Sequence, residues 1–269
     1  MEVRIKNIRI GEENSPKIMG VLNISPESFF SDSFTPCDQV VTRVEEMIRE
    51  GADIIDLGAR STALNAPPLT VAEERERVLT AMKELDGYGA VLSLDTMYPE
   101  VLEAALHYDL AAVNDINGLG NPEYAKIAAD AGLPVIAMAA HRLPGDPLDL
   151  AGTHAALREI LSRAEQYGIR DLILDPGVGK WVADRPLEAD WELCRQFSSL
   201  NQYGCPLLAA VSRKTFIGDV IGKPAHERLY GTLGVLFCLL QSGAALVRVH
   251  DVAASRDVVR VFEKLCRNR

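Results

Sequence analysis

Residues 18–22 read Ile-Met-Gly-Val-Leu, residues 40–49 read Val-Val-Thr-Arg-Val-Glu-Glu-Met-Ile-Arg, and residues 53–57 read Asp-Ile-Ile-Asp-Leu. The first and third runs are short, mainly apolar and not alternating, which is typical of parallel strands covered on both faces. The segment between them is amphipathic, because its apolar residues fall on one stripe of a helix: Val40, Val44, Met47 and Ile48. Together the three segments predict a strand, a helix and a second, parallel strand.

The same alternation continues along the chain. Further apolar runs lie at Ala90–Leu94, Ala111–Val113, Pro134–Met138, Asp171–Leu174, Pro206–Val211 and Ala245–Val249. Helix-like segments lie between or after them at Thr70–Leu85, Pro99–Leu106, Leu119–Gly132, Ala151–Tyr167, Pro186–Leu200, Ala225–Leu240 and Ala253–Leu265. Eight strand–helix units predict a (β/α)8 TIM barrel, which we expect to form a single domain over residues 1–269.

Two features bear on this fold prediction. The alternating segment Val3–Ile10 predicts an extra N-terminal strand or hairpin that closes the barrel bottom. A doubly wound open sheet is the alternative fold. Such a sheet usually carries a glycine-rich fingerprint after its first strand, where this chain has Asn23-Ile24-Ser25-Pro26.

Composition excludes several classes of protein. Lys and Arg total 28 against 38 Asp and Glu, a formal net charge of −10, which argues against binding to nucleic acid or to an anionic membrane. The longest apolar stretch, Leu233–Leu240, is too short to cross a bilayer. The segment Met1–Lys6 has no apolar signal region, and the five cysteines follow no pairing pattern. We therefore expect a cytoplasmic protein with reduced thiols.

Polar residues follow each predicted strand. In chain order they are Asn23, Ser61-Thr62, Asp95-Thr96, Asn114-Asp115, His141-Arg142, Asp175, Ser212-Arg213-Lys214 and Arg248 with His250-Asp251. The carboxyl ends of barrel strands meet on one rim, where active sites of this fold lie. A single Asp in such a place is often a helix cap, and we expect that role for Asp115 and Asp251.

The chemistry of the rim divides by charge. Lys214, Arg248 and His250 follow the seventh and eighth strands, the usual phosphate site of this fold. Asp95 and Asp175 are carboxylates near the centre, so the rim suits a ligand with N–H donors at one end and an anion at the other. No HxH or HExxH motif is present, which leaves Mg²⁺ arriving with a polyphosphate as the metal to expect.

The rim motifs resemble those of dihydropteroate synthases, including archaeal-type homologues, over nearly the whole chain. They are Met19–Phe29, Gly51–Gly58 with Ser61-Thr62, Leu94–Thr96, Asn114–Ile116, Asp175–Gly177, Val211–Lys214 and Arg248–Asp251. The resemblance implies a single (β/α)8 barrel, usually dimeric. It also implies a transferase that joins a dihydropterin methyl diphosphate to an arylamine and releases diphosphate, in folate or methanopterin biosynthesis.

The resemblance also implies residue roles. The catalytic residues would be Lys214, Asp95, Arg248 and His250. The pterin would be held by Asp95, Asn114, Met138, Asp175 and Lys214. The diphosphate would be bound by Asn23, Thr62, Arg248 and His250, with Mg²⁺ on Asn23. The arylamine side would include Arg213, Thr215 and Trp181.

Three loops depart from the family pattern. Ala63 and Leu64 stand where the family usually has Arg and Pro, and Val178-Gly179-Lys180-Trp181 replaces an aromatic-rich run. Met138-Ala139-Ala140-His141 replaces Met-His-Met after the fifth strand. The arylamine side is therefore altered, which predicts slow turnover of p-aminobenzoate and faster turnover of a larger, phosphorylated aniline riboside. Trp181 either supplies an aromatic wall or packs on the surface.

Two further interpretations concern function and assembly. A pterin-binding methyltransferase or a non-catalytic pterin-binding protein of the same superfamily is the alternative function. Retention of Lys214, Arg248 and His250 disfavours both, because neither needs a diphosphate site. The segment Gly231–Leu240 is apolar nearly all round, whereas an outer barrel helix needs one apolar stripe, so we expect a homodimer or burial under the N-terminal segment.

Overall fold

The computed structural model describes residues 1–26, 34–61 and 66–267. Within these residues a closed barrel is formed by β3 (Lys17–Asn23), β4 (Ile54–Gly58), β5 (Leu92–Asp95), β6 (Leu110–Asp115), β7 (Val135–Met138), β8 (Leu172–Asp175), β9 (Leu207–Ala209) and β10 (Ala244–Val249). Each strand pairs in parallel with the next, and β10 closes the barrel by pairing with β3. The predicted TIM barrel is confirmed.

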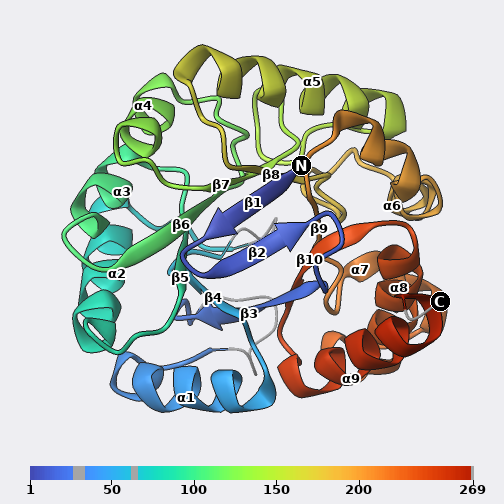
Figure 1. Cartoon of the computed structure of the whole chain (residues 1–269), viewed down its shortest axis with the longest axis horizontal. Helices are drawn as coiled ribbons and strands as arrows, with labels where there is room; N and C mark the ends of the chain where they lie inside the picture. Colours follow the sequence, from blue (N-terminus) through green and yellow to red (C-terminus); the bar gives the residue numbers. More distant parts are fainter. Residues whose placement is uncertain (27–33, 62–65, 268–269) are drawn as a thin grey trace.

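Helices form a ring around this barrel (Figure 1). They are α1 (Val40–Glu50), α2 (Val71–Leu85), α3 (Pro99–Ala105), α4 (Pro122–Asp130), α5 (Leu150–Tyr167), α6 (Leu187–Arg195), α7 (Thr215–Ile221), α8 (Leu229–Gln241) and α9 (Val252–Phe262). All were predicted except the seven-residue α7, which follows β9 directly. The segment predicted as a helix over Pro186–Leu200 ends at Arg195 and continues as a 3-10 turn, Phe197–Tyr203.

Capping explains why α2 begins where it does. The Thr70 side chain accepts the Glu73 backbone N–H, and the Glu73 carboxylate accepts the Thr70 backbone N–H in return. This capping box satisfies two N–H groups that the first helical turn leaves unpaired. The capping box therefore sets the first residue of α2, the helix that follows β4 in the chain.

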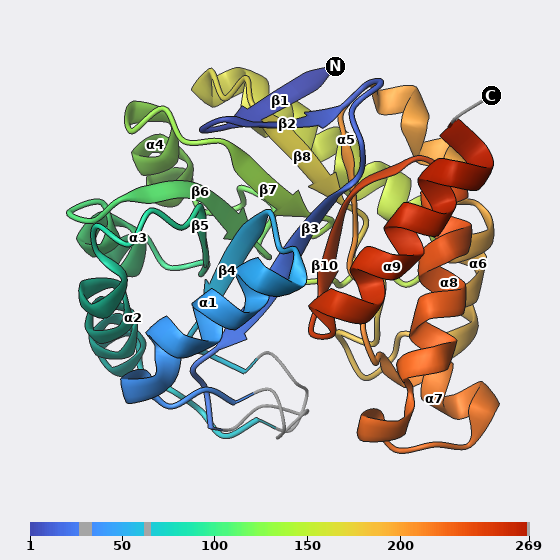
Figure 2. The ribbon, with the colours of Figure 1, turned by 60° about the horizontal axis from the view of Figure 1, so that its bottom comes forward.

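The N-terminal segment forms an antiparallel hairpin of β1 (Glu2–Ile5) and β2 (Ile8–Gly11). Figure 2 shows this hairpin across one end of the barrel, opposite the end where α7 follows β9. The hairpin buries the side chains of Val3, Ile5 and Ile10. They pack on barrel-interior residues such as Met19 and Leu246. The hairpin therefore closes the amino end, as predicted, and leaves the carboxyl ends of the strands to form the mouth.

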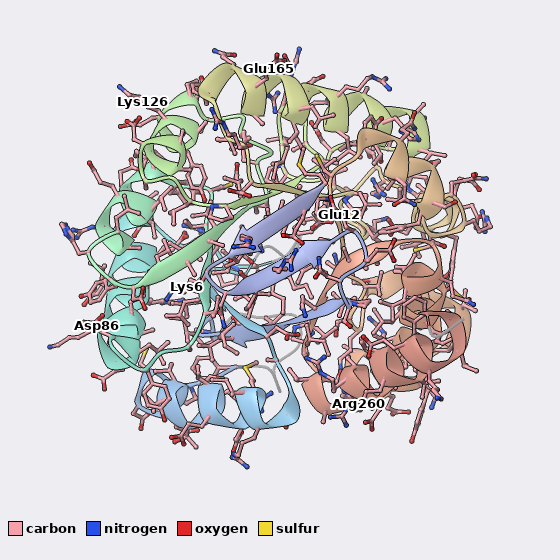
Figure 3. The ribbon with its side chains drawn as sticks, in the orientation of Figure 1. Lys6, Glu12, Asp86, Lys126, Glu165 and Arg260 are labelled. Carbon is pink, nitrogen blue, oxygen red and sulfur yellow. The ribbon has the colours of Figure 1, made fainter. Side chains whose placement is uncertain are left out.

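The outer surface is charged. Figure 3 shows Asp86, Lys126, Glu165 and Arg260 pointing outward from the ring of helices. Among the described residues, no helix combines the length and the apolar character needed to cross a membrane. The five cysteines, all of them described, carry free thiols.

Candidate active site in the barrel mouth

A cavity of about 110 Å³ opens at the carboxyl ends of the strands. Its polar lining comes mainly from β3, β4, β5, β9 and β10 and the loops after them: Asn23, Arg60, Asp95, Ser212, Lys214, Arg248 and His250. Five of these residues were predicted site residues, so the structure brings together the rim chemistry that the sequence indicated. Thr62 lies outside the described residues.

Arg248 is the centre of a partly buried ionic network. Its Nε donates to Asp56 Oδ2 at 2.6 Å, and its Nη2 donates to Asp95 Oδ2 at 2.5 Å. Burial acts to lower the pKa of Arg248, but the two carboxylates outweigh it and raise that pKa. For Asp95, burial outweighs the attraction of Arg248 and raises the pKa to about 7. Arg248 thus keeps one fixed positive charge between two carboxylates.

Asn114 and Met138 lie deeper in the mouth. Asn114 donates from Nδ2 to Asp56 Oδ2 at 3.0 Å, so Asp56 joins it to the Arg248 network. Met138 ends β7 in register with Asp175, and its side chain is fully buried. Both side chains are buried and neither lines the cavity, whereas the resemblance implied that both hold the pterin.

Lys214 and Asp175 influence each other through their opposite charges without direct contact. Burial lowers the pKa of Lys214 to about 8, against the opposing attraction of Asp175. Burial likewise raises the pKa of Asp175, against the opposing charge of Lys214. One oxygen of Asp175 also accepts the Gly177 backbone N–H at 2.8 Å. Together these two residues offer a carboxylate acceptor and an ammonium donor, which suits a flat heterocycle carrying N–H and C=O groups.

The loop after β8 wraps around Lys214. The Lys214 ammonium donates to the Val178 carbonyl and lies 4.8 Å from the centre of the Trp181 ring. Gly179 has φ +130°, and a Cβ there would lie 2.9 Å from Lys214 Cδ. The Trp181 ring packs against Gly145 of the loop after β7. Trp181 therefore forms a wall of the mouth, the first of the two interpretations left open by the sequence.

His250 is a neutral hydrogen-bonding group in this mouth. Its Nδ1 lies 3.0 Å from Ser212 Oγ, which also accepts the His250 backbone N–H. Burial first, and then the charge of Arg248, lower the pKa of His250 to about 3. His250 is therefore a hydrogen-bond partner for a ligand rather than a cation.

Arg213 and Thr215 lie away from the mouth cavity. Arg213 has φ +56°, and its guanidinium pairs with both carboxylate oxygens of Asp251 at 2.7 and 2.8 Å. It also donates to the carbonyls of Ala225 and His226. Thr215 is exposed at the start of α7. Neither lines the cavity among the described residues. Asp251 likewise pairs with Arg213 instead of capping α9 through its side chain.

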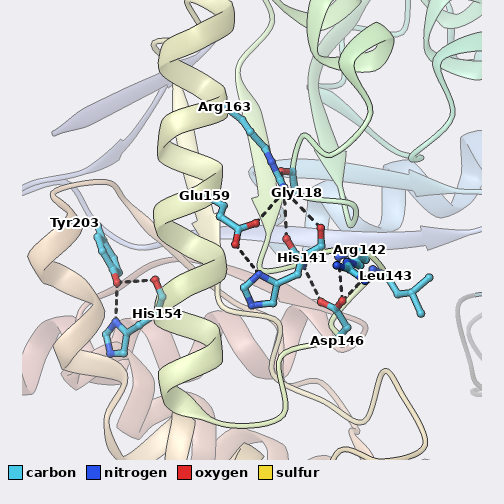
Figure 4. Close-up of polar contacts among 10 residues, drawn as sticks. Gly118, His141, Arg142, Leu143, Asp146, His154, Glu159, Arg163 and Tyr203 are labelled. Atoms are coloured by element: carbon cyan, nitrogen blue, oxygen red, sulfur yellow. Dashed lines mark hydrogen bonds and ion pairs between the residues drawn. The ribbon is translucent and has the colours of Figure 1, made fainter.

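The loop after β7 turns its histidine outward. The Asp146 carboxylate accepts the backbone N–H groups of residues 141–143, which fixes the loop (Figure 4). His141 Nδ1 lies 2.8 Å from Glu159 of α5, and Arg163 bonds the other Glu159 oxygen at 3.0 Å. His141, which the sequence placed at the rim, therefore belongs to the contact between this loop and α5.

Sequence reasoning missed two residues of the site, Asp56 and Arg60. Asp56 is fully buried and pairs with Arg248, but it stands inside an apolar run and gave no strand-end signal. Ser212, which the sequence placed at a strand end, contacts His250. Arg60 lines the cavity and pairs with Glu74 of α2. For Arg60, the available signal was its position two residues after Gly58, directly before Ser61-Thr62.

This fold and this mouth define a class: a TIM barrel whose mouth combines carboxylates with a lysine and an ion-paired arginine. The chain matches the family described as Pterin binding enzyme over residues 19–250. The dihydropteroate synthase of Haemophilus influenzae is 32% identical over 263 residues, covering 92% of this chain and 93% of that protein.

Solved structures agree with this relationship. A dihydropteroate synthase of Xanthomonas albilineans with 4-aminobenzoic acid superposes with a TM-score of 0.84 at 31% identity, over 98% of this chain and 97% of that one. One from Yersinia pestis with a sulfonamide drug gives a TM-score of 0.89 at 26% identity, covering both chains fully (100% each). The chain therefore belongs to the pterin-binding enzyme family, and within it is an enzyme of the dihydropteroate synthase type.

Proposed function

We propose that the barrel mouth joins 6-hydroxymethyl-7,8-dihydropterin diphosphate to p-aminobenzoate, with release of diphosphate, in folate biosynthesis. The observation that carries this proposal is the meeting of the Arg248–Asp95 ion pair and the Lys214 ammonium in one cavity, with the Asp175 carboxylate near enough to act on the pKa of Lys214. The relatives named above support the same reaction. We place it in the cytoplasm, where the free thiols of this chain would remain reduced.

The buried floor would hold the pterin. A pterin presents adjacent N–H donors, which the Asp175 and Asp95 carboxylates can accept, and Asn114 adds an amide beside Asp56. Lys214 would donate to the ring carbonyl or nitrogen, exchanging its present bond to the Val178 carbonyl for a ligand bond. These groups orient the pterin methylene carbon toward the opening, where the amine enters.

Arg248 and His250 would act on the leaving group. In the reaction the amine nitrogen bonds to the methylene carbon, the bond to diphosphate oxygen breaks with its electron pair, and the amine proton leaves. Negative charge grows on the diphosphate, and fixed donors aimed at that charge stabilise the transition state more than the ground state. The Arg248 charge and the neutral His250 imidazole line the cavity for this role.

Asn23 would hold Mg²⁺ together with the diphosphate. Asn23 is buried at the end of β3, lines the mouth, and presents an amide oxygen, the ligand type that Mg²⁺ takes. Among the described residues, no three His, Cys, Asp or Glu side chains are grouped to bind a metal. This fits an ion bound through one protein oxygen and the substrate phosphates, which would neutralise charge on the leaving group.

The decisive experiment is a turnover assay with the pterin diphosphate and a panel of amines. We expect diphosphate release coupled to an arylamine product with p-aminobenzoate, and none without an amine. A phosphorylated aniline riboside belongs in the panel, because the altered loops predict that it reacts faster. Failure of every amine, with pterin binding intact, would favour a non-catalytic pterin-binding protein.

The pH dependence of kcat/KM for the pterin diphosphate should be bell-shaped. Asp95 must be ionised to accept pterin N–H groups, so activity should rise through its pKa of about 7. Lys214 must be protonated to donate, so activity should fall above its pKa of about 8. Rates measured from about pH 5 to about pH 10 test this profile. In Lys214→Arg, the remaining activity should lose its alkaline limb, and a flat wild-type profile would contradict both assignments.

We also propose a homodimer through α7 and α8. α8 contacts α7, α9 and β10. The N-terminal hairpin lies at the end of the barrel, so it does not cover the outer face of α8. That face exposes Tyr230 at 83%, and α7 beside it exposes Val220 at 66%. Light scattering at micromolar concentration should give twice the chain mass, and Tyr230→Glu should shift it toward the monomer. A monomeric wild type would contradict the proposal.

A further inference from the structure

Arg60 stands out among the cavity residues because nothing in the proposed reaction yet uses it. It follows β4 by two residues and lines the mouth with Arg248 and His250. Its side chain is 17% exposed, and its Nη2 is buried without a hydrogen-bond partner among the described residues. Buried guanidinium N–H groups normally find an acceptor, so an unpaired one on a residue that lines a substrate cavity points to a ligand that supplies the acceptor.

The surroundings of Arg60 hold its guanidinium in one place. Its Nε donates to Glu74 Oε2 at 2.5 Å, and the other Glu74 oxygen accepts the Thr96 hydroxyl at 2.6 Å. The guanidinium also lies over the Tyr98 ring, 4.9 Å from its centre. Glu74 is almost completely buried, so the anchor is rigid. A guanidinium group held through its Nε–H keeps its remaining N–H donors pre-organised for an oxyanion.

The position of Arg60 in the barrel indicates which anionic group of the substrate it binds. β10, β3 and β4 are neighbours in the barrel. Arg248 and His250 come from β10 and its loop, Asn23 ends β3, and Arg60 follows β4. Lys214 and Trp181 belong to the other arc, after β9 and β8. We propose that Arg60 is a further substrate-binding residue, which donates to the diphosphate of the pterin substrate. This inference rests on the proposed function.

Binding calorimetry with two probes tests it. The probes are 6-hydroxymethylpterin, which lacks phosphate, and its diphosphate ester with Mg²⁺. In Arg60→Ala we expect the affinity for the diphosphate ester to fall about 10- to 100-fold, the loss of one charge-assisted hydrogen bond, with bare pterin within about twofold of wild type. Arg60→Lys should recover part of the loss, because it keeps the charge without the fork.

Arg75→Ala is the matched control. Arg75 is exposed on α2, the helix that carries Glu74, and it does not line the cavity, so both affinities should stay at the wild-type value. Equal loss of both probes in Arg60→Ala would make Arg60 a structural residue and overturn the inference. A raised KM for p-aminobenzoate with unchanged diphosphate binding would also overturn it. Failure of wild type to bind either probe would instead overturn the proposed function.

Discussion

Arg248→Ala should be less stable than the wild type by about 3–5 kcal/mol, the usual cost of leaving buried carboxylates without their partner. The reason lies in Asp56 and Asp95, whose side chains are 0% and 17% exposed and which both bond the guanidinium. Such a loss is a large part of the total stability of a domain, about 5–15 kcal/mol. Chemical denaturation of the two proteins measures it.

The pH dependence of that loss identifies its cause. Without Arg248, the pKa of Asp95 should rise above its present value of about 7, far above its value in the unfolded chain. The folded variant then takes up a proton that the unfolded chain does not hold, so its stability rises as the pH falls through the new pKa. The deficit against wild type should therefore be larger at about pH 8 than at about pH 6.

Two variants complete this test. Arg248→Lys keeps the charge but not the two-pronged contact, and it should lie between wild type and Arg248→Ala. Arg260→Ala on α9 removes an arginine whose side chain is 72% exposed, and stability should change by less than about 0.5 kcal/mol. A deficit in Arg248→Ala that does not change with pH would show that lost packing, rather than unpaired charge, is its origin. If Arg248→Ala binds diphosphate as tightly as the wild type does, the assignment of Arg248 to the anion site is wrong.

The barrel was predictable because its signals are local and repeated. Each strand is a short apolar run, such as Val135–Met138, and each following helix has one apolar stripe or a cap such as Thr70. α7 was missed although α3 has the same length of seven residues, because α3 begins with the helix-start signal Pro99 and α7 has neither such a proline nor a side-chain cap. Short helices were therefore predictable only where a start signal marks them.

The site was predictable only in part, because strand ends show position but not partners. Asn23, Asp95, Lys214, Arg248 and His250 meet in one cavity as expected. Which acid faces which base depends on side-chain direction across the barrel, and the sequence does not display that direction. Asp56 was missed for this reason, since it looked like a polar interruption of a strand. Arg213 does not line this cavity, and its guanidinium pairs with Asp251, a partner that the sequence did not indicate.

The second large effect is expected at Arg185, which holds the loop around Lys214. Arg185 and Asp190 are 1% and 0% exposed, and they pair at 2.9 Å. Arg185 also donates to the Pro147 carbonyl, and Asp190 accepts the Gly179 backbone N–H at 2.8 Å. The pair therefore ties the loop after β8 to the loop after β7. Arg185→Leu should cost about 3–5 kcal/mol, because Asp190 keeps a buried charge with no cation beside it.

A double-mutant cycle separates charge from packing at this pair. Replacing both residues, in Arg185→Leu with Asp190→Leu, removes the unpaired charge and should recover part of the stability lost in Arg185→Leu. The double variant should still bind pterin weakly, because the Gly179 N–H loses its acceptor and the Val178 carbonyl and Trp181 no longer hold Lys214 in place. Arg195 is an exposed, ion-paired arginine on α6, the helix that carries Asp190. Arg195→Ala should therefore change neither the stability nor the affinity for pterin measurably. If the double variant were as unstable as Arg185→Leu yet bound pterin normally, the pair would serve packing alone, and the loop would hold Lys214 without it.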